Sequence, residues 1–130
     1  MLGKVLVRLV VMSILTAAWS ACGITGSGPS DTVKKFNKAV ETGQLDEAVK
    51  HLSPALLQMF PPQKIKAMLG EETQKIKKKK GISSFEVTKE EVTGEVADLH
   101  VVVKFGDGTT RSEDTHLTKE NGQWKISPKK

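Results

Sequence analysis

The apolar residues of this chain follow two different spacings, and the change falls near Gly81. Between residues 31 and 80 they recur at intervals of three or four positions, which is the period of an amphipathic helix. From residue 82 to residue 127 they alternate with polar residues, which is the period of a half-buried strand. The pattern therefore predicts helices in the first half of the chain and strands in the second.

The first predicted helix carries its apolar face from Val33 to Val40 and ends at Gly43. Ser30 or Asp31 caps it, because a short polar side chain can accept hydrogen bonds from the first backbone N–H groups of a helix.

A second, short helix covers residues 46–52 and ends before Pro54, since the residue before a proline is disfavoured in the helical region. Residues 56–60 are predicted to form an apolar turn. A third helix runs from about Gln63 to Lys80. Its predicted buried face consists of Ile65, Met68, Leu69 and Ile76.

In the second half, one strand begins at Ile82 and the clearest strand covers residues 97–105. Gly106–Gly108 and Asn121-Gly122 are hairpin turns, so two further strands follow over residues 109–119 and 123–127. The strand over residues 109–119 is polar and is predicted to lie near an edge of the sheet. The order predicts an α+β domain, with N-terminal helices packed on a curved antiparallel sheet of about four strands.

Residues 1–21 have the pattern of an export signal. Lys4 and Arg8 precede an apolar run over Leu9–Ala18, which is well short of the roughly 20 residues that span a bilayer. The small residues Ser20 and Ala21 then stand directly before the only cysteine of the chain, Cys22.

Small residues before a cysteine resemble the lipobox of bacterial lipoproteins, where signal peptidase II cleaves and the cysteine carries the lipid. Trp19 departs from that pattern, which usually has Leu three residues before the cysteine. Cleavage after Ser20 by the peptidase of soluble exported proteins, or an uncleaved anchor, are the alternatives. A single cysteine forms no internal disulfide, and lipidation accounts for it in an oxidising compartment. We therefore predict a lipid anchor on Cys22, with a membrane as its partner.

Residues 22–30 contain the lipidated cysteine and a short flexible tether over Gly23–Ser30, and residues 31–130 form a single domain. Gly23 is not the Asp that commonly retains lipoproteins at the inner membrane. In a Gram-negative host the resemblance therefore predicts the outer membrane, with the domain facing the periplasm. The chain has 20 Lys and Arg against 15 Asp and Glu, and an exported protein with so modest an excess is not expected to bind nucleic acid.

Two stretches carry a resemblance to a family. Residues 32–48 resemble the opening of small bacterial lipoproteins with a domain of unknown function of the nuclear transport factor 2-like superfamily. Gly106–Thr110 and Gly122-Gln123-Trp124-Lys125-Ile126 are similar to the glycine turn and the final strand of the same proteins. The resemblance covers nearly all of the mature chain and implies a cone-shaped sheet around helices, with a pocket between them. It implies no activity.

Candidate chemistry is sparse. Some enzymes of this superfamily use an Asp or His base inside the cone, and Asp98 and His100 are the nearest candidates. Both alternate with apolar residues, so they are expected on the solvated face of the sheet. His51, His100 and His116 are scattered, and no metal or other cofactor is expected. Trp124 is expected to pack in the core.

A lysine run, Lys75 with Lys77, Lys78, Lys79 and Lys80, falls at the end of the third predicted helix. Cations at that position complement the helix dipole, and the alternative is contact with an anionic lipid or cell-wall surface. The sequence thus predicts a membrane-tethered, non-enzymatic lipoprotein of the cell envelope that binds a small apolar ligand or an envelope partner. The alternatives are an assembly subunit that forms a homodimer through its sheet and, less favoured, an enzyme that uses the cone pocket.

Overall fold

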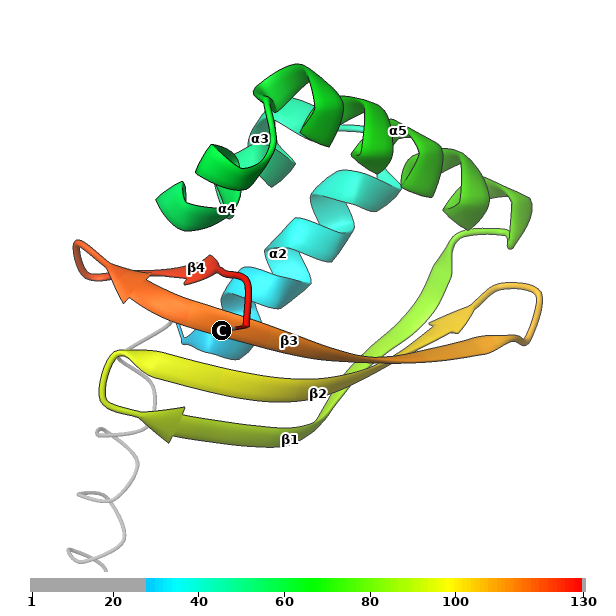
Figure 1. Cartoon of the computed structure of the whole chain (residues 1–130). Helices are drawn as coiled ribbons and strands as arrows, with labels where there is room; N and C mark the ends of the chain where they lie inside the picture. The colour runs from blue at the N-terminus through cyan, green and yellow to red at the C-terminus, as the bar shows by residue number, and fades with distance from the viewer. Residues whose placement is uncertain (1–27, 130) are drawn as a thin grey trace, which may run out of the picture.

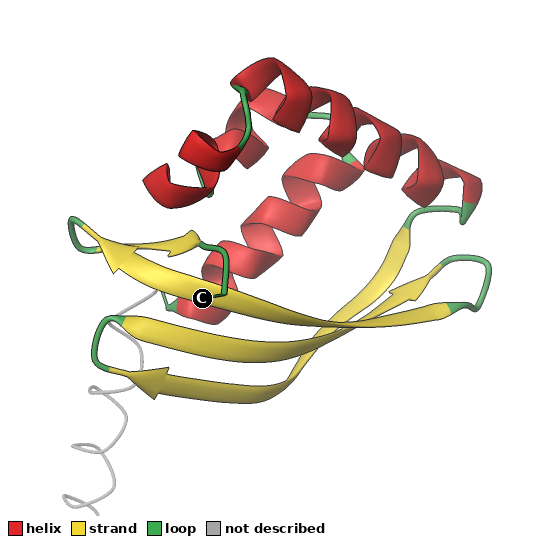
Figure 2. Cartoon of the chain, in the orientation of Figure 1, coloured by secondary structure: helices red, strands yellow, loops and turns green. Residues whose placement is uncertain are grey.

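Residues 28–129 are described by the computed structural model, which places four helices on one side of a four-stranded antiparallel sheet (Figures 1 and 2). All the helices of this range precede all its strands, so the α+β prediction is confirmed. Cys22, the export signal predicted over residues 1–21 and the first part of the predicted tether lie outside the described residues.

Helix α2 (Pro29–Glu41) begins earlier than the sequence predicts. Gly28 is its N-terminal cap residue, whereas Ser30 and Asp31 lie inside the helix and make no capping hydrogen bond. A proline suits the first helical position, because its φ is already near the helical value and it has no N–H group to leave unbonded. Gly43 follows the helix with a φ of +75°, in agreement with the predicted end.

Two short helices, α3 (Leu45–Val49) and α4 (Pro54–Met59), connect α2 to the long helix α5 (Pro62–Lys78). The turn predicted for residues 56–60 is wrong, because α4 covers most of that range. The cause is Ser53, whose Oγ accepts a hydrogen bond from the backbone N–H three residues later (3.2 Å) and so caps a helix. None of the residues of α4 is buried.

The strands lie side by side in the order in which they occur: β1 (Ile82–Thr93), β2 (Val96–Phe105), β3 (Thr110–Glu120) and β4 (Gln123–Ile126). Both predicted hairpin turns are confirmed. β4 is short and pairs only with Leu117–Glu120 of β3. β3 lies beside the edge strand β4, so its predicted position near an edge of the sheet is confirmed, and residues 110–116 of β3 have no β4 residue paired with them.

The core lies between α2, α5 and the inner face of the sheet, and Trp124 belongs to it, as predicted. On α5 the inward side chains recur from Ile65 through Thr73 to Ile76, whereas Met68 is 53% exposed. The predicted burial of Met68 is wrong because it lies about 100° around the helix from its neighbour Leu69, outside this narrow face. The buried apolar residues of the cluster are Val33, Ala39, Val40, Ala48, Ile76, Ala97, Leu99, Val101, Val103, Phe105, Leu117 and Trp124.

Helix α5 ends within the lysine run, as predicted. Gly81 N–H donates to the Ile76 carbonyl (2.9 Å) and Lys80 N–H to the Lys77 carbonyl (3.0 Å), with Lys80 in the left-handed region at φ +64°. This is the Schellman arrangement that closes a helix. The turn between β2 and β3 packs directly on this helix end, since Gly106 N–H donates to the Gly81 carbonyl (2.9 Å).

Candidate functional site

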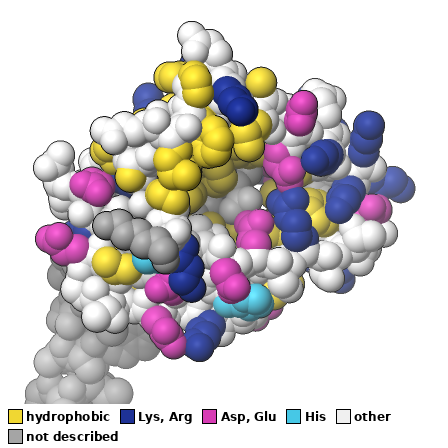
Figure 3. Space-filling model, viewed as in Figure 1, with side chains coloured by type: hydrophobic (Ala, Val, Ile, Leu, Met, Phe, Trp, Pro, Cys, Tyr) yellow, Lys and Arg dark blue, Asp and Glu magenta, His cyan; other side chains and the backbone are white. Residues whose placement is uncertain are grey.

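A cleft opens between α2, α5 and β3, and it is our candidate site. It consists of two adjoining hollows of about 230 and 240 Å³. In the space-filling view, apolar side chains gather around a depression between the helices and the sheet (Figure 3). The first hollow is lined by Phe36, Asn37, Val40, Leu69, Glu72, Arg111 and Glu113. The second is lined by Val33, Phe36, Asn37, Glu113, Asp114, Thr115, His116, Ile126 and Ser127.

The apolar walls of the cleft come from α2, α5 and β4. Phe36 and Leu69 pack against the core but are only partly buried, as is Ile126 at the end of β4. The cleft exists because β4 is short, so that the sheet beside residues 110–116 of β3 has no further strand to fill the space below α5. The helical period that the sequence showed in α2 thus positions side chains for the cleft as well as for the core.

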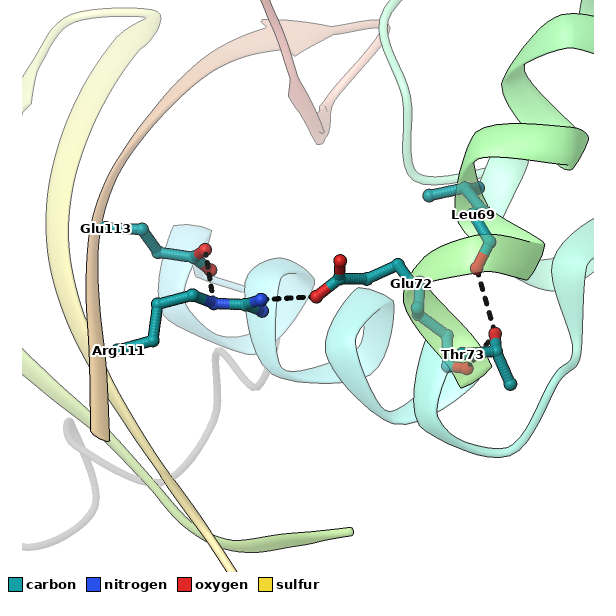
Figure 4. Close-up of polar contacts among 6 residues, drawn as sticks. Leu69, Glu72, Thr73, Arg111 and Glu113 are labelled. Carbon is teal, nitrogen blue, oxygen red and sulfur yellow. Dashed lines mark hydrogen bonds and ion pairs between the residues drawn. The ribbon is translucent and has the colours of Figure 1, made fainter. Parts of the chain in front are cut away.

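Three charged side chains lie together at one side of the cleft (Figure 4). Arg111 Nη1 donates to the Glu72 carboxylate of α5, and Arg111 Nε lies 3.5 Å from Glu113 Oε2 on the same strand. The guanidinium also lies 5.4 Å from the centre of the Phe105 ring. The group has one cation and two anions, so the local field of the cleft is negative. Its members come from α5 and β3, and sequence reasoning did not find them.

Buried Thr73 joins the two helices that form the back of the cleft. Its Oγ1 lies 2.6 Å from the Val40 carbonyl of α2 and 2.9 Å from the Leu69 carbonyl of its own helix (Figure 4). A buried hydroxyl needs a partner, and the Val40 carbonyl, which also accepts the Gly43 N–H (3.2 Å), gains a second donor from the neighbouring helix. This contact therefore fixes α5 against α2.

The outer face of the sheet carries Asp98 and His100, the two residues that the sequence offered as bases. The register places them on the face opposite the core, as predicted. It also places each beside a partner on β3: Asp98 Oδ1 lies 2.8 Å from His116 Nδ1, and His100 Nδ1 lies 2.6 Å from Asp114 Oδ1. The hydrogen bond from His116 lowers the pKa of Asp98. Sequence reasoning missed these two cross-strand pairs, although the turn at Gly106–Gly108 fixes their register.

The third histidine, His51, lies apart from these pairs, in a hollow of about 310 Å³ that it shares with Trp124 and Lys125. Burial lowers its pKa. Within residues 28–129, no three His, Cys, Asp or Glu side chains converge in a way that could hold a metal ion.

A larger hollow, of about 500 Å³, is a groove between α2 and the start of β1. Lys34, Lys35 and Lys38 line it on one side, and Asp31 lies 2.9 Å from the Lys35 ammonium. Ile82 and Phe85 of β1 give this groove an apolar side, but its α2 side is formed by exposed lysines, whereas apolar residues of two helices, Phe36, Val40 and Leu69, line the cleft.

The lysine run lies at the end of α5, away from the cleft. Lys75, Lys77, Lys78 and Lys80 are exposed, whereas Lys79 is partly buried with its Nζ 4.6 Å from the centre of the Phe105 ring. Cys22, the predicted lipidation site, lies outside the described residues.

Comparisons with known proteins extend over most of the chain. A family model described as Domain of unknown function (DUF4878) matches residues 20–127. An NTF2-like protein from Campylobacter jejuni, whose name suggests a transpeptidase, superposes with a TM-score of 0.71 at 21% identity, over 79% of this chain and 100% of that one. A SEC-C motif-containing protein from Rhodopseudomonas palustris gives a TM-score of 0.53 at 15% identity, over 75% and 73% of the two chains.

At these identities the solved structures bear on the fold alone, and they confirm the predicted nuclear transport factor 2-like architecture. The chain has no significant match among curated proteins. None of the helices between residues 28 and 129 combines the length and the apolar character needed to cross a bilayer.

Proposed function

We propose, for a chain that belongs to the family described as Domain of unknown function (DUF4878), a non-enzymatic binding role in the cell envelope. The cleft between α2, α5 and β3 takes up an apolar group of a small ligand or of an envelope partner. The observation that carries the proposal is the composition of the first hollow: its walls are the partly buried side chains of Phe36 and Leu69 with buried Val40, and its charged groups are gathered at one side. Ligand sites generally combine apolar walls with a few placed polar groups.

The polar groups of the cleft favour binding over catalysis. A covalent mechanism needs a nucleophile within hydrogen-bond reach of a base. The second hollow has the hydroxyls of Thr115 and Ser127, and the Ser127 Oγ lies 3.2 Å from the Ser53 Oγ rather than beside a base. His116 contacts Asp98 through Nδ1 on the outer face, and no hydroxyl within residues 28–129 is hydrogen-bonded to its ring, while Arg111 holds both Glu72 and Glu113. These pairings support a role in which the cleft binds and releases its ligand unchanged, and they give no support to a transpeptidase activity.

The place of this binding role is proposed from the sequence. The basic start, the short apolar run and the small residues before Cys22 support export and lipid attachment, and in a Gram-negative host they support the outer membrane. A lipid anchor leaves the domain at the membrane surface. The exposed lysines at the end of α5, Lys75 to Lys80, then provide a surface that could meet anionic lipid or cell-wall polymer.

Binding of a neutral apolar dye, Nile red, to residues 28–130 tests the cleft. Leu69→Gln places an amide in the apolar wall and should weaken dye binding by about tenfold, because a polar group is then desolvated by the bound dye. Met68→Gln is the matched control: it precedes Leu69 on the same helix but is exposed, so affinity should change by no more than about twofold. Equal affinities for the two variants would contradict the proposed site.

A further inference from the structure

The edge of β3 is open beside the cleft. β2 pairs with β3 without interruption from Thr110 to Thr118, whereas β4 pairs with it only from Leu117 to Glu120. No strand of the described range 28–129 lies on the other side of residues 110–116. In Figure 1 this stretch of β3 continues past the end of β4, below α5.

The hydrogen bonds at the end of β4 show which backbone groups the open edge presents. Ser127 N–H donates to the His116 carbonyl (2.8 Å), whereas Lys119 N–H donates toward β2, to Glu95 (2.8 Å). In an antiparallel sheet successive residues turn their N–H and C=O groups to opposite sides. Because the register is unbroken, Ser112 and Asp114 turn theirs to the open edge.

This edge has no β-bulge, one of the devices that prevent strand addition, although it carries the charged side chains of Arg111, Glu113 and Asp114. The other edge strand of the sheet, β1, has register shifts near Ser84 and Lys89, and bulges of this kind discourage pairing with a further strand. β3 has no such irregularity in its pairing with β2, and its residues Ser112 and Asp114 are exposed. The open backbone groups of β3 are therefore a template for one more strand.

The side chains beside this edge add specificity. A strand paired with Ser112 and Asp114 would direct alternate side chains into the cleft, one opposite Thr115 and one opposite Glu113. The position opposite Thr115 faces the hollow that Phe36 and Ile126 help to line, so it suits an apolar residue. The position opposite Glu113 faces the net negative charged group, so it suits Lys or Arg.

We propose that the cleft receives an extended peptide that adds to the sheet as a strand along residues 110–116 of β3, antiparallel to it and in line with β4. The peptide carries an apolar residue and, two positions later, a basic one. This inference rests on the proposed function and names its partner as a peptide. Because Glu72 of α5 pairs with Arg111 of β3, the helix stays close to this edge, which favours a single strand over the sheet of a second copy as the occupant.

The test uses the fluorescein-labelled peptide Ser-Thr-Val-Thr-Lys-Thr-Ser and its fluorescence anisotropy. The full chain is held in solution by nanodiscs of phosphatidylcholine. This lipid is zwitterionic and has no net charge, so the lysine of the peptide does not bind to the nanodisc itself. Ser112→Pro removes the outward N–H without breaking a bond to β2, and it should raise the Kd at least about tenfold. Ser112→Ala keeps that N–H and should leave the Kd within about twofold. Thermal melts of both variants check that they are folded.

A modified peptide gives the same test without any change in the protein. Methylation of the backbone nitrogen of the threonine between Val and Lys removes the N–H group that faces Asp114, and it should abolish binding. Lys→Glu in the peptide should weaken binding, and the loss should shrink when Glu113→Gln is introduced. Three results would each overturn the inference. The first is equal binding of the peptide to the Ser112→Pro and Ser112→Ala variants, and the second is unimpaired binding of the methylated peptide. The third is the absence of binding when the apolar position of the peptide holds Val, Leu or Phe. Nile red binding that Leu69→Gln weakens would still support the proposed function in those cases, so the two fail separately.

Discussion

Single residues behind the cleft connect its walls to the stability of the domain. Thr73 is the clearest case, because one buried hydroxyl lies between the end of α2 and the body of α5. Nothing in the sequence pattern indicates this role: the helical period counts apolar positions, and Thr73 interrupts the apolar face of α5 as a polar residue. Its partner carbonyl, that of Val40, is distant in the sequence and is brought near only by the packing of the two helices.

Thr73→Val keeps the shape of the side chain and removes the hydroxyl. We expect the free energy of unfolding to fall by about 1 kcal/mol, since the Val40 carbonyl loses a buried donor. Thr88→Val is the control, because the Thr88 hydroxyl donates to His100 at an exposed position and its loss should cost no more than about 0.5 kcal/mol. Urea denaturation measures both. A loss at Thr73 no greater than the loss at Thr88 would show that the buried contact does not join the helices.

At the scale of elements, the contact between the end of α5 and the turn that follows β2 depends on a missing side chain. A Cβ at Gly106 would lie 2.3 Å from the Lys80 carbonyl oxygen, which is backbone and cannot move aside cheaply. At Gly70, inside α5, the nearest atom to an added Cβ is Leu45 Cδ1 at 3.7 Å, an ordinary contact. The two glycines therefore differ in whether alanine fits.

Gly106→Ala should lower the free energy of unfolding by about 1–3 kcal/mol, the usual cost of an overpacked contact. Gly70→Ala should raise it by up to about 1 kcal/mol, because alanine favours a helix interior more than glycine does. Thermal or urea denaturation of the two variants gives the signs directly. Destabilisation by Gly70→Ala, or an unchanged Gly106→Ala, would show that the packing between these elements differs from the structure.

Most of the elements could be predicted from the sequence, because each is set by a local period or a local turn. The alternation from Ala97 to Phe105 and the two glycine turns fix three strands and their connections. The prediction is wrong where a single residue starts a helix that the period does not show. Ser53 caps a helix over residues that were predicted to form an apolar turn, and Pro29 starts α2 before the predicted polar cap residues. Such outcomes depend on a single hydrogen bond or backbone angle rather than on a period.

For the whole molecule, the family resemblance implies a pocket between helices and sheet, but the residues that line the cleft could not be predicted, because its position depends on the relative lengths of strands. A strand four residues long leaves part of β3 uncovered, and only the folded arrangement brings Arg111 of β3 to Glu72 of α5. The same holds for the paired Asp98 and His116 on the outer face, which the sequence shows as isolated polar positions. Lipid attachment is the opposite case, since it is read from the sequence at Cys22 and lies outside the described residues.

Cys22→Ser tests the proposed attachment of the molecule to a membrane. Serine has no thiol to form the thioether, so the variant should accumulate as an uncleaved precursor or leave the membrane fraction. Cell fractionation and electrophoretic mobility distinguish these from the mature lipidated protein. Normal processing together with normal membrane association would contradict lipidation, and in a Gram-negative host recovery with the inner membrane would contradict the proposed outer-membrane location.

The claim on which the functional account depends is that the cleft between α2, α5 and β3 binds an apolar group. The most direct measurement is a titration of ¹⁵N-labelled residues 28–130 with Nile red, followed by the backbone amide signals. The account predicts that the amides of Phe36, Leu69 and Glu113 shift together and saturate at one affinity, while those of Asp98 and His100 on the outer face of the sheet stay in place. Shifts confined to the outer face, or to the groove between α2 and β1, would contradict it.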